Sequence, residues 1–379
     1  MAVTGAPLMA AWPAVYPLSV RRPWPRGQSR HAARRKIGPV NPGSHAMMLI
    51  VGAGAVGTIL AAYATRAAKM PLRLYVRNID LDAVQGVEQI CVDHVLGGRP
   101  ALRVAKPTLT QALDLSDVRY LVICVKYPDL ASVLDALPAI PPHCTVIPTL
   151  NGVGALRRLH ERFPGASVAP MTIMFNGQWL APLHARITTK PQVLVGSRDA
   201  TLLGAFEGSG MAVEAIEGEA AIWGKLLINL GHAICAASHA TFKDLITHPD
   251  LKACYFRVFD EAAEILGRAN ISVVLPIPMP VRVYQLLLRR GGPLAWWLAR
   301  SRSGLQAGSY PSMVADVTQG RPTEVMQLNG EIVTLAERLG RDAPINRRLC
   351  ELINAMAGAR PKPLTPGELR QRLGVDLDA

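Results

Sequence analysis

Residues 48–57 read Met-Leu-Ile-Val-Gly-Ala-Gly-Ala-Val-Gly. A short apolar run precedes the glycines, and a segment with the apolar period of a helix, Val56–Ala68, follows them. This order predicts a strand, a tight glycine-rich turn and a helix. A second apolar run, Leu72–Val76, completes a βαβ unit. An α/β fold is therefore expected to begin near Met47.

The three glycines of the turn differ in what they allow. Gly52 permits the tight turn, Gly54 lets the backbone approach a pyrophosphate without a Cβ atom in between, and Gly57 lets helix and strand pack closely. The phosphates would face unpaired N–H groups at the positive end of the helix dipole. The spacing predicts a dinucleotide-binding turn; a glycine-rich turn without a ligand is the alternative. The predicted cofactor-binding residues of the turn are Gly52, Ala53, Gly54, Ala55, Val56 and Gly57.

The residue after the second predicted strand distinguishes NAD from NADP. An acidic residue there would bond the ribose 2′-hydroxyl and repel a 2′-phosphate. This chain has Arg77, 25 residues after Gly52, and a guanidinium group at that position favours NADP. An ordinary surface arginine is the other interpretation.

Short apolar runs continue the alternation of strands and helices. Strands are expected at Leu121–Val125 and Thr145–Pro148, with a helix at Leu130–Leu137 between them. The late elements expected are the strands Val193–Val195 and Met211–Ala215 and the helix Ala200–Glu207. We therefore predict an N-terminal Rossmann domain over residues 47–217, with a mostly parallel, doubly wound sheet.

After about Glu217 the pattern changes. Strand-like alternation disappears, and long segments have helical length and apolar period. The expected helices are Ala221–Ala240, Leu251–Arg268 and Val325–Leu339. The proline- and arginine-containing segment Pro276–Ser303 is expected to be an irregular or partly helical insertion. An all-helical C-terminal domain over residues 218–379 is the prediction.

Polar residues follow two of the predicted parallel strands. Lys126 comes directly after Leu121–Val125, and Asn151 with Gly152 comes after Thr145–Pro148. The carboxyl ends of parallel strands share one edge of a sheet, and open α/β sheets bind their ligands at that edge. We therefore expect Lys126 and Asn151 to contact cofactor or substrate.

The second half contains candidates for proton transfer. When a hydride reduces a ketone, the resulting alkoxide needs a proton, and a lysine can supply it and stabilise the negative charge. Lys225 lies in a strongly apolar helical segment, with Asn229 four residues later on the same face. Glu324 is the expected carboxylate partner. The alternatives are a solvated lysine on an amphipathic helix and a favourable charge in the first turn of a helix.

The composition is typical of a packed globular protein in a reducing compartment. Of the 379 residues, 50% are apolar and 18% are charged, which argues against general disorder. The six cysteines have no CxxC spacing, so neither a metal site nor a disulfide framework is predicted, and a cytoplasmic setting is expected. No run of about 18 uninterrupted apolar residues appears, so no membrane span is expected.

The net charge of +13 is unevenly distributed. Residues 1–46 carry six Arg and one Lys with no Asp or Glu, which leaves +6 for the rest of the chain. That charge suits a dinucleotide phosphate and an anionic substrate and does not call for a nucleic acid. The proline-rich leader lacks any helical or strand period. Its interpretations are a transit peptide, a basic binding arm and, as the favoured one, a tail or a start codon placed before the true start at Met47 or Met48.

The chain from Met48 to about Leu352 resembles the ketopantoate reductase (2-dehydropantoate 2-reductase) family. The motifs that carry the resemblance are Gly52-Ala-Gly-Ala-Val-Gly57, Val125-Lys126, Asn151-Gly152, Trp223-Gly-Lys225 with Asn229, Ser312-Met-Val-Ala-Asp316, and Thr323-Glu324 followed by Asn329-Gly330. The resemblance implies a Rossmann domain joined to an all-helical domain, with the active site between them and NADPH as the cofactor. The implied reaction is hydride transfer to the C2 carbonyl of ketopantoate, a small anionic 2-oxo acid, in pantothenate biosynthesis.

The same resemblance implies a role for each candidate residue. Lys225 takes the place of the general acid, and Glu324 that of the carboxylate near the reacting hydroxyl. The implied substrate contacts are Asn151, Asn229 and Ser312, and the implied cofactor contacts outside the turn are Arg77, Lys126 and Asn151. A homodimer is the assembly that the resemblance allows.

Three departures from the family pattern concern the substrate. Leu150 stands where the family frequently has Gln before the Asn-Gly pair. Ala233 stands where an Asn is common two turns after the helix lysine, and Ser309 replaces an Asn near the Ser-Met motif. Each hydrogen bond missing from a buried site costs about 1–3 kcal/mol, so ketopantoate is expected to be a poorer substrate here. The segment Pro276–Ser303 is expected to reshape the cleft.

Three rival functions stay open. The first is a sister dehydrogenase for another 2-oxo acid or an opine-like substrate, which a panel of oxo acids would separate. The second is a non-enzymatic NADP-binding regulator, against which the presence of both Lys225 and Glu324 argues. The third is a nucleic-acid-binding protein that uses its basic leader, which predicts that binding is lost when residues 1–46 are deleted while cofactor binding survives.

Overall fold

The computed structural model describes residues 47–277, 279–357 and 362–377. They belong to one compact unit, which spans Ser44–Ala379. The interpretations of residues 1–46 as a tail, a transit peptide or a binding arm lie outside the described residues and stay predictions.

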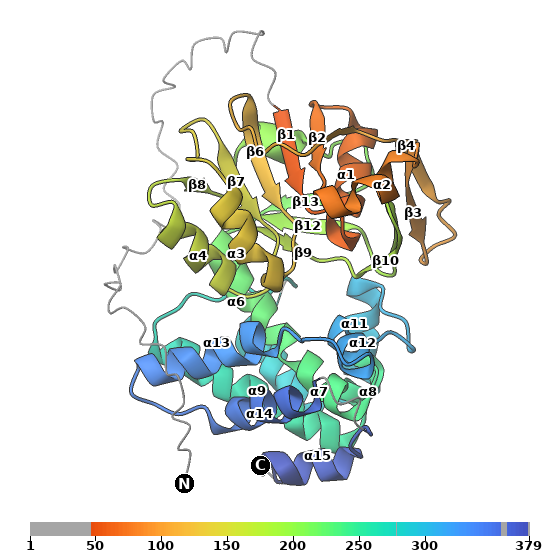
Figure 1. Ribbon diagram of the computed structural model, residues 1–379. Coiled ribbons are helices and arrows are strands. Elements are labelled where there is room, and N and C mark those ends of the chain that lie inside the picture. The colour runs from red at the N-terminus through yellow and green to blue at the C-terminus, as the bar shows by residue number, and fades with distance from the viewer. Residues whose placement is uncertain (1–46, 278, 358–361, 378–379) are drawn as a thin grey trace, which may run out of the picture. The chain divides into compact units, whose positions relative to one another are not determined.

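A six-stranded parallel sheet forms the first half of the described chain (Figure 1). Its strands lie in the order β5-β2-β1-β6-β7-β8, and every neighbouring pair is parallel. The bounds are β1 Met47–Val51, β2 Leu72–Tyr75, β5 Thr108–Thr110, β6 Val118–Ile123, β7 Thr145–Pro148 and β8 Ser167–Val168. The chain moves from β1 to β2 on one side and starts again at β6 on the other, so the carboxyl ends of β1 and β6 form the switch point where such sheets bind ligands. The predicted doubly wound sheet is confirmed.

The central strand β1 is buried on both faces, as the middle of a parallel sheet requires. Met48 and Ile50 pack in one apolar cluster with α1, whereas Leu49 and Val51 pack in another with α3 and α4. Figure 1 shows these helices on opposite sides of the sheet. Their bounds are α1 Ala55–Ala67, α3 Tyr127–Ala136 and α4 Gly154–Arg162. Burial on both faces explains why the strand is a continuous apolar run and not an alternating one.

Two smaller sheets complete this half. One has the order β10-β11-β3-β4, and α1 packs against it; the other has the order β13-β12-β9. The strand bounds are β3 Gln89–His94, β4 Leu102–Ala105, β9 Met171–Ile173, β10 Gly177–Ala181, β11 His184–Ile187, β12 Gln192–Val195 and β13 Ala212–Ala215. The helices α2 Asn78–Gln85 and α5 Ala200–Gly204 lie between strands along the chain. The four-stranded sheet was not predicted, because its strands are short and the pairing of β11 with β3 joins distant parts of the chain.

Some predicted bounds differ from the structure. The strand predicted at Leu121–Val125 is β6, which begins at Val118 because it pairs with the whole length of β1. The helix predicted at Ala200–Glu207 ends at Gly204 as α5. These shifts leave the order of the predicted elements unchanged.

The rest of the described chain is helical, as predicted. The helices are α6 Gly218–Asn229, α7 Gly231–Ser238, α8 Phe242–Thr247, α9 Pro249–Arg268, α10 Val281–Arg290, α11 Gly292–Ser303, α12 Ser312–Thr318, α13 Val325–Arg338, α14 Pro344–Met356 and α15 Pro366–Leu373. The long helix α9 contributes Tyr255 and Phe259 to the common core of these helices. The segment Pro276–Ser303 contains α10 and α11, so the predicted insertion is mostly helical and only in part irregular.

The helices α6 and α7 follow each other almost directly and are mostly buried in the helical half. Only Leu230 separates the two helices, and it keeps helical angles (φ −55°, ψ −28°). The stretch Gly218–Ser238 is long and apolar enough to cross a membrane, with a mean hydropathy of 1.3, yet 83% of its apolar window is buried inside the fold. Gly224 lets α6 pack closely against the segment that contains Val274, because a Cβ atom at position 224 would lie 1.9 Å from the carbonyl oxygen of Val274. A helix that is apolar on all sides needs such complete packing.

Candidate functional site

The glycine-rich turn has the geometry that a bound pyrophosphate needs. Gly52 has a φ of +108°, a conformation that favours glycine. A Cβ atom on Gly54 would meet no atom within 4 Å, so the space next to this backbone is open. Helix α1 begins after Gly54 with no side-chain cap and no acidic residue in its first turn. Its first N–H groups therefore point to an anion site that no carboxylate of that turn opposes.

Gly57 serves packing within the protein. A Cβ atom at this position would lie 1.8 Å from the carbonyl oxygen of Gly52. Thr58 closes the turn from the helix side by donating its hydroxyl hydrogen to the Ala53 carbonyl at 3.1 Å. Gly57 is therefore required for packing, whereas Gly54 leaves open space next to the turn.

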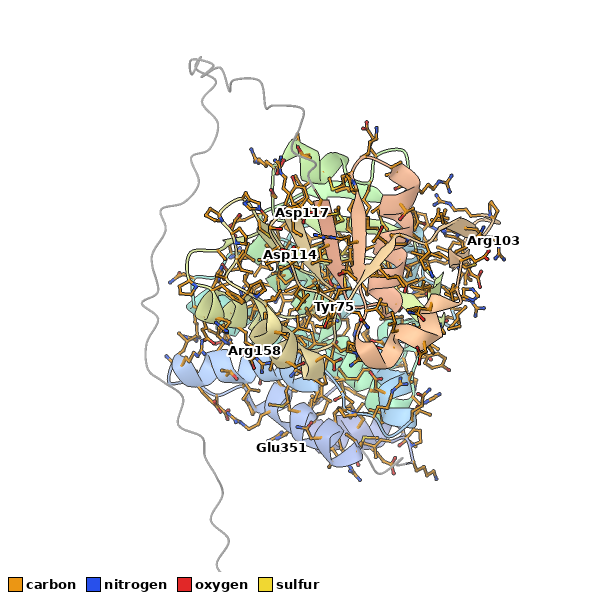
Figure 2. All side chains as sticks on the ribbon, turned by 45° about the horizontal axis from the view of Figure 1, so that its top comes forward. Tyr75, Arg103, Asp114, Asp117, Arg158 and Glu351 are labelled. Carbon is orange, nitrogen blue, oxygen red and sulfur yellow. The ribbon has the colours of Figure 1, made fainter. Side chains whose placement is uncertain are left out.

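Two cations lie at the carboxyl edge of the sheet. Arg77 precedes α2, two residues after Tyr75 at the end of β2, which Figure 2 labels. Its Nε donates to Asp80 Oδ2 at 2.8 Å and its Nη1 to Asp129 Oδ1 at 3.5 Å, yet the side chain remains 59% exposed. Lys126 is exposed and precedes α3. The structure thus places both predicted cofactor residues at the edge where the glycine turn lies.

The turn after β7 is tied to the helical half through Asn151. The Tyr127 hydroxyl donates to the Asn151 carbonyl at 2.8 Å and accepts from the Ala155 N–H at 3.0 Å, which holds the turn in place. Asn151 Nδ2 then donates to Glu324 Oε2 at 3.0 Å. Glu324 precedes α13 and makes no side-chain cap on that helix. The carboxylate is bonded to Asn151, and Glu324 also stands at the start of α13, so both interpretations of Glu324 stay predictions.

Two further contacts join this part of the sheet domain to α13, and the sequence did not predict either of them. Arg157 on α4 donates two hydrogen bonds to the Glu331 carboxylate on α13, both at 3.1 Å. Gly152 has a φ of +73°, and a Cβ atom there would lie 2.1 Å from the carbonyl oxygen of Gln327. Helix α13 is therefore seated directly on the turn that carries Asn151. A bidentate arginine–carboxylate pair fixes orientation as well as distance.

Lys225 extends from α6 to the three-stranded sheet, where β9 ends. Its Nζ donates to the main-chain carbonyl of Ile173 at the end of β9, at 2.5 Å. Burial lowers the pKa of Lys225 to about 8, and the Glu324 carboxylate opposes that shift. The cationic form is therefore costly enough to release its proton near neutral pH. Such an amine is suited to proton donation.

His232 is a neighbour of Lys225 that sequence analysis missed. It lies seven residues after Lys225, on α7, and its ring meets the Phe242 ring edge to face at 5.7 Å between centroids. Burial, with a further contribution from Lys225, lowers the pKa of His232 to about 3. The imidazole is therefore neutral at pH 7. The helical spacing from Lys225 was the signal that could have identified it.

The other two predicted substrate residues lie on different helices. Asn229 is buried on α6, one turn after Lys225, and Ser312 is exposed at the start of α12, which packs against α7. No hydrogen bond within the described part of the chain joins either of them to Lys225. Ala233 is fully buried at 0% exposure, so its methyl group belongs to the core.

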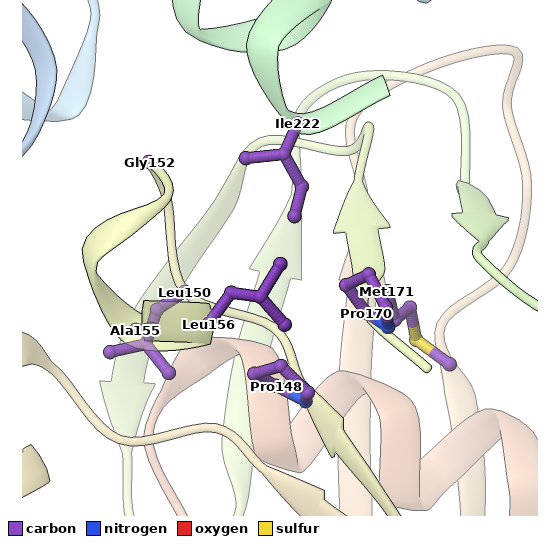
Figure 3. Close-up of a pocket in the computed structure, with 8 residues that line it drawn as sticks. All are labelled: Pro148, Leu150, Gly152, Ala155, Leu156, Pro170, Met171 and Ile222. Carbon is purple, nitrogen blue, oxygen red and sulfur yellow. The ribbon is translucent and has the colours of Figure 1, made fainter. Parts of the chain in front are cut away.

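An apolar pocket lies beside the Asn151 turn (Figure 3). Its lining residues are Pro148, Leu150, Gly152, Ala155, Leu156, Pro170, Met171 and Ile222. Ile222 is one turn before Lys225 on α6, and Leu150 directly precedes Asn151. The lining has no charged side chain, and the space inside is about 10 Å³, roughly enough for one water molecule. Leu150, one of the departures from the family pattern, contributes to this apolar character.

Comparisons with known proteins agree with this arrangement. The family described as ketopantoate reductase PanE/ApbA matches residues 48–200, and its C-terminal domain matches residues 218–357. A 2-dehydropantoate 2-reductase of Pyrobaculum aerophilum is 26% identical over 311 residues, covering 82% of this chain and 97% of that protein. A 2-dehydropantoate 2-reductase of Aquifex aeolicus is 24% identical over 326 residues, covering 81% of this chain and 96% of that protein.

Solved structures share the fold. A PanE/ApbA family ketopantoate reductase from Ralstonia eutropha superposes with a TM-score of 0.67 at 21% identity, covering 83% of this chain and 99% of the other. A dimeric ketopantoate reductase from Staphylococcus aureus has a TM-score of 0.62 at 18% identity, with 83% and 100% covered. A D-mandelate dehydrogenase with NADH and anilino(oxo)acetate has a TM-score of 0.65 at 18% identity, with 87% and 100% covered. The glycine turn, the Asn151–Glu324 joint and Lys225 all lie inside the two family matches, and the chain belongs to the ketopantoate reductase family.

Proposed function

We propose that this protein is an NADPH-dependent oxidoreductase that reduces the C2 carbonyl of ketopantoate to the hydroxyl of pantoate. The observation that carries the proposal is Lys225, a half-buried lysine near the Glu324 carboxylate, which is itself bonded to Asn151 at the edge of the sheet. We assign residues 47–217 to cofactor binding and residues 218–379 to substrate binding and catalysis. The names of the relatives support this reaction. We further propose that the protein acts in the cytoplasm, in pantothenate biosynthesis.

The residues of the turn and the sheet edge fit a dinucleotide phosphate. The open space next to Gly54 and the uncapped start of α1 suit the pyrophosphate. Arg77 would hold the 2′-phosphate, and Lys126 adds a second cation at the same edge. When bound, the reduced nicotinamide supplies the hydride for the carbonyl carbon of the substrate.

Lys225 Nζ would hold and deliver the proton that the substrate oxygen takes up. An ammonium group has three hydrogens; one is bonded to the Ile173 carbonyl, which leaves two for the Glu324 carboxylate and the substrate oxygen. A donor with a pKa of about 8 is protonated at neutral pH and still gives up its proton readily. In a site shielded from water, its charge also stabilises the developing alkoxide more strongly than in bulk solvent.

Polar groups around Lys225 would orient the 2-oxo acid. Asn151 fixes Glu324, so that the carboxylate can accept a hydrogen bond from the new hydroxyl group. Asn229 and Ser312 offer an amide and a hydroxyl for the rest of the anionic substrate. The small apolar pocket beside Asn151 adds an uncharged surface next to these polar groups.

Another 2-oxo acid or an opine-like compound is the second candidate substrate. Ala233, where an Asn is common in the family, is buried and offers no side-chain hydrogen bond, and the neutral His232 stands near Lys225 instead. A buried site that lacks one partner for a polar group discriminates strongly between similar substrates. We further propose a homodimer as the assembly, which light scattering of the purified chain would measure.

The deciding experiment follows the fall in NADPH absorbance with the purified full chain and ketopantoate, beside other 2-oxo acids and with NADH in place of NADPH. Turnover that is fastest with ketopantoate supports the proposed reaction. Faster turnover with another oxo acid would assign the second candidate. Tight NADPH binding with no turnover on any oxo acid would identify a cofactor-binding regulator.

Replacing Arg77 with alanine is expected to weaken NADPH binding about 10- to 100-fold and to leave NADH binding unchanged. Removal of a charge-assisted bond to the 2′-phosphate costs about 1.5–3 kcal/mol, and NADH has no such group. Fluorescence titration of both dinucleotides measures the effect. Arg338→Ala, at an exposed arginine in the last turn of α13, is the control. Equal losses for NADPH and NADH would contradict the role given to Arg77.

Replacing Glu324 with glutamine is expected to move the alkaline limb of kcat/KM for reduction to lower pH. Reduction needs protonated Lys225, so kcat/KM falls as pH rises through its pKa of about 8. The Glu324 carboxylate raises that pKa, and a neutral amide removes the effect. The amide still has an oxygen that can accept the Asn151 hydrogen bond.

The control for this profile is Glu337→Gln, at an exposed carboxylate on the same helix. The alkaline limb of kcat/KM in this control is expected at the same pH as in the wild type. A limb that stays in place in Glu324→Gln, or moves to higher pH, would exclude Lys225 as the group that titrates under the influence of Glu324.

A further inference from the structure

A thiol, a carboxylate and an imidazole gather on the four-stranded sheet. Cys91 and Asp93 are two residues apart on β3 and share one face, and His184 on β11 is the register partner of Cys91. The other face of these strands, which includes Ile90 and Val92, packs in the apolar cluster of α1. The three polar side chains therefore lie on the outer face of the sheet, and the proposed reaction uses none of them.

The donor atoms lie at separations that suit a tetrahedral metal ion. His184 Nε2 is 3.1 Å from Asp93 Oδ2, and Cys91 Sγ is 3.8 Å from Asp93 Oδ1. All three donor groups lie within 4.8 Å of one another. Metal–ligand bonds of about 2.0–2.3 Å at tetrahedral angles put neighbouring N, O and S donors roughly 3.3–3.7 Å apart. Small side-chain movements are therefore enough to bring all three onto one ion.

One side chain of the cluster is buried, and the other two are partly exposed to solvent. Cys91 is only 8% exposed, whereas the side chains of His184 and Asp93 are 36% and 32% exposed. Three protein donors with solvent on one side leave the fourth coordination position to water. A bound metal ion would displace the thiol proton and release it to solvent.

Two arginines face the cluster and oppose a cation. Arg186 Nη2 lies 3.8 Å from Asp93 Oδ2, and its side chain is 42% exposed, so it has room to turn toward solvent. Arg103 on β4 is the register partner of Cys91, and Figure 2 shows it at the outer margin of the fold. These guanidinium groups reduce the affinity for a cation, which makes their removal a sensitive test.

We propose that Cys91, Asp93 and His184 form a binding site for a borderline-soft divalent cation, of which Zn²⁺ fits the donor set. Thiolate, imidazole and carboxylate are the ligands that zinc takes in proteins, whereas Ca²⁺ and Mg²⁺ prefer sites made of oxygen. The ion would join β3 to β11 and stabilise the four-stranded sheet against which α1 packs. Its fourth position holds water.

Cobalt is the probe that tests the donor set without any measurement of activity. The full chain is freed of metal with a chelator, titrated with Co²⁺ and followed by absorption spectroscopy. We expect one Co²⁺ per chain, a thiolate-to-cobalt charge-transfer band and the intense visible bands of tetrahedral coordination, all removed by added Zn²⁺. Zn²⁺ alone is expected to raise the thermal midpoint of unfolding.

Variants assign the ligands and keep the test independent of folding defects. Cys91→Ala is expected to lose the charge-transfer band, and His184→Ala to bind Co²⁺ at least about tenfold more weakly. Cys144→Ala, at a buried cysteine outside the cluster, should keep both band and affinity. Arg186→Gln should bind Co²⁺ about two- to fivefold more tightly, a gain that misfolding does not produce. An octahedral spectrum without the charge-transfer band, or a band that survives in Cys91→Ala, would overturn the proposal.

Discussion

Replacing Lys225 with alanine is expected to lower kcat for reduction of the 2-oxo acid by about 10²–10⁴-fold and to leave the affinity for NADPH unchanged. The loss is this large because one ammonium group both donates the proton and stabilises the negative oxygen in a buried site. The glycine turn and Arg77, which we assign to the cofactor, stay intact. The rate of NADPH oxidation measures kcat, and fluorescence titration measures NADPH binding.

A second lysine and an added amine make this test specific. Lys243→Ala, at an exposed lysine on α8, is expected to keep wild-type kcat. Methylamine is expected to restore part of the activity of Lys225→Ala, because it can enter the space of the lost side chain and donate a proton. Wild-type kcat in Lys225→Ala, or an equal loss of NADPH binding, would remove Lys225 from the role of proton donor.

The substitutions Gly54→Ala and Gly57→Ala are expected to fail in different ways. At Gly57 the new Cβ atom would lie 1.8 Å from a backbone oxygen, so the strand and helix must separate, and the free energy of unfolding should fall by about 3 kcal/mol. At Gly54 the new atom meets nothing within 4 Å, and a φ of −73° suits alanine. Stability should therefore change by less than about 0.5 kcal/mol. NADPH affinity at Gly54 should nevertheless fall about 10- to 100-fold, because the methyl group occupies the place of the pyrophosphate.

Urea unfolding and NADPH titration of both variants separate these effects. Gly86→Ala, which ends α2 at a φ of −74° and whose Cβ atom would also meet nothing within 4 Å, is the matched control. It is expected to change neither quantity. A Gly54→Ala protein that binds NADPH normally would show that the pyrophosphate does not lie against this turn.

The fold could be predicted where its elements depend on local spacing. Strand β1, the glycine turn and α1 follow one another directly, and burial on both faces makes β1 a continuous apolar run. The strands β3 and β11 could not be found in this way. They are short and carry polar residues such as Asp93, and they pair with each other although they lie far apart in the sequence.

The candidate site also combines features that the sequence could predict with features that it could not. Residue type and position made Lys225 and Asn151 candidates, one on a predicted helix and one after a predicted strand, whereas they left two interpretations of Glu324 open. The hydrogen bond from Asn151 to Glu324 could not be predicted, because 173 positions separate the two residues. His232 was overlooked, although its helical spacing from Lys225 was visible in the sequence.

Order along the chain was therefore sufficient to establish the βαβ beginning, the glycine turn, the parallel sheet and the helical second half, because periodicity and glycine positions act over a few residues. Contacts between distant segments determined how α13 packs against the Asn151 turn, and they brought Cys91, Asp93 and His184 together. Burial in the tertiary fold also lowers the pKa of Lys225 to about 8 against the opposing effect of the Glu324 carboxylate, because both effects act through space and not along the backbone.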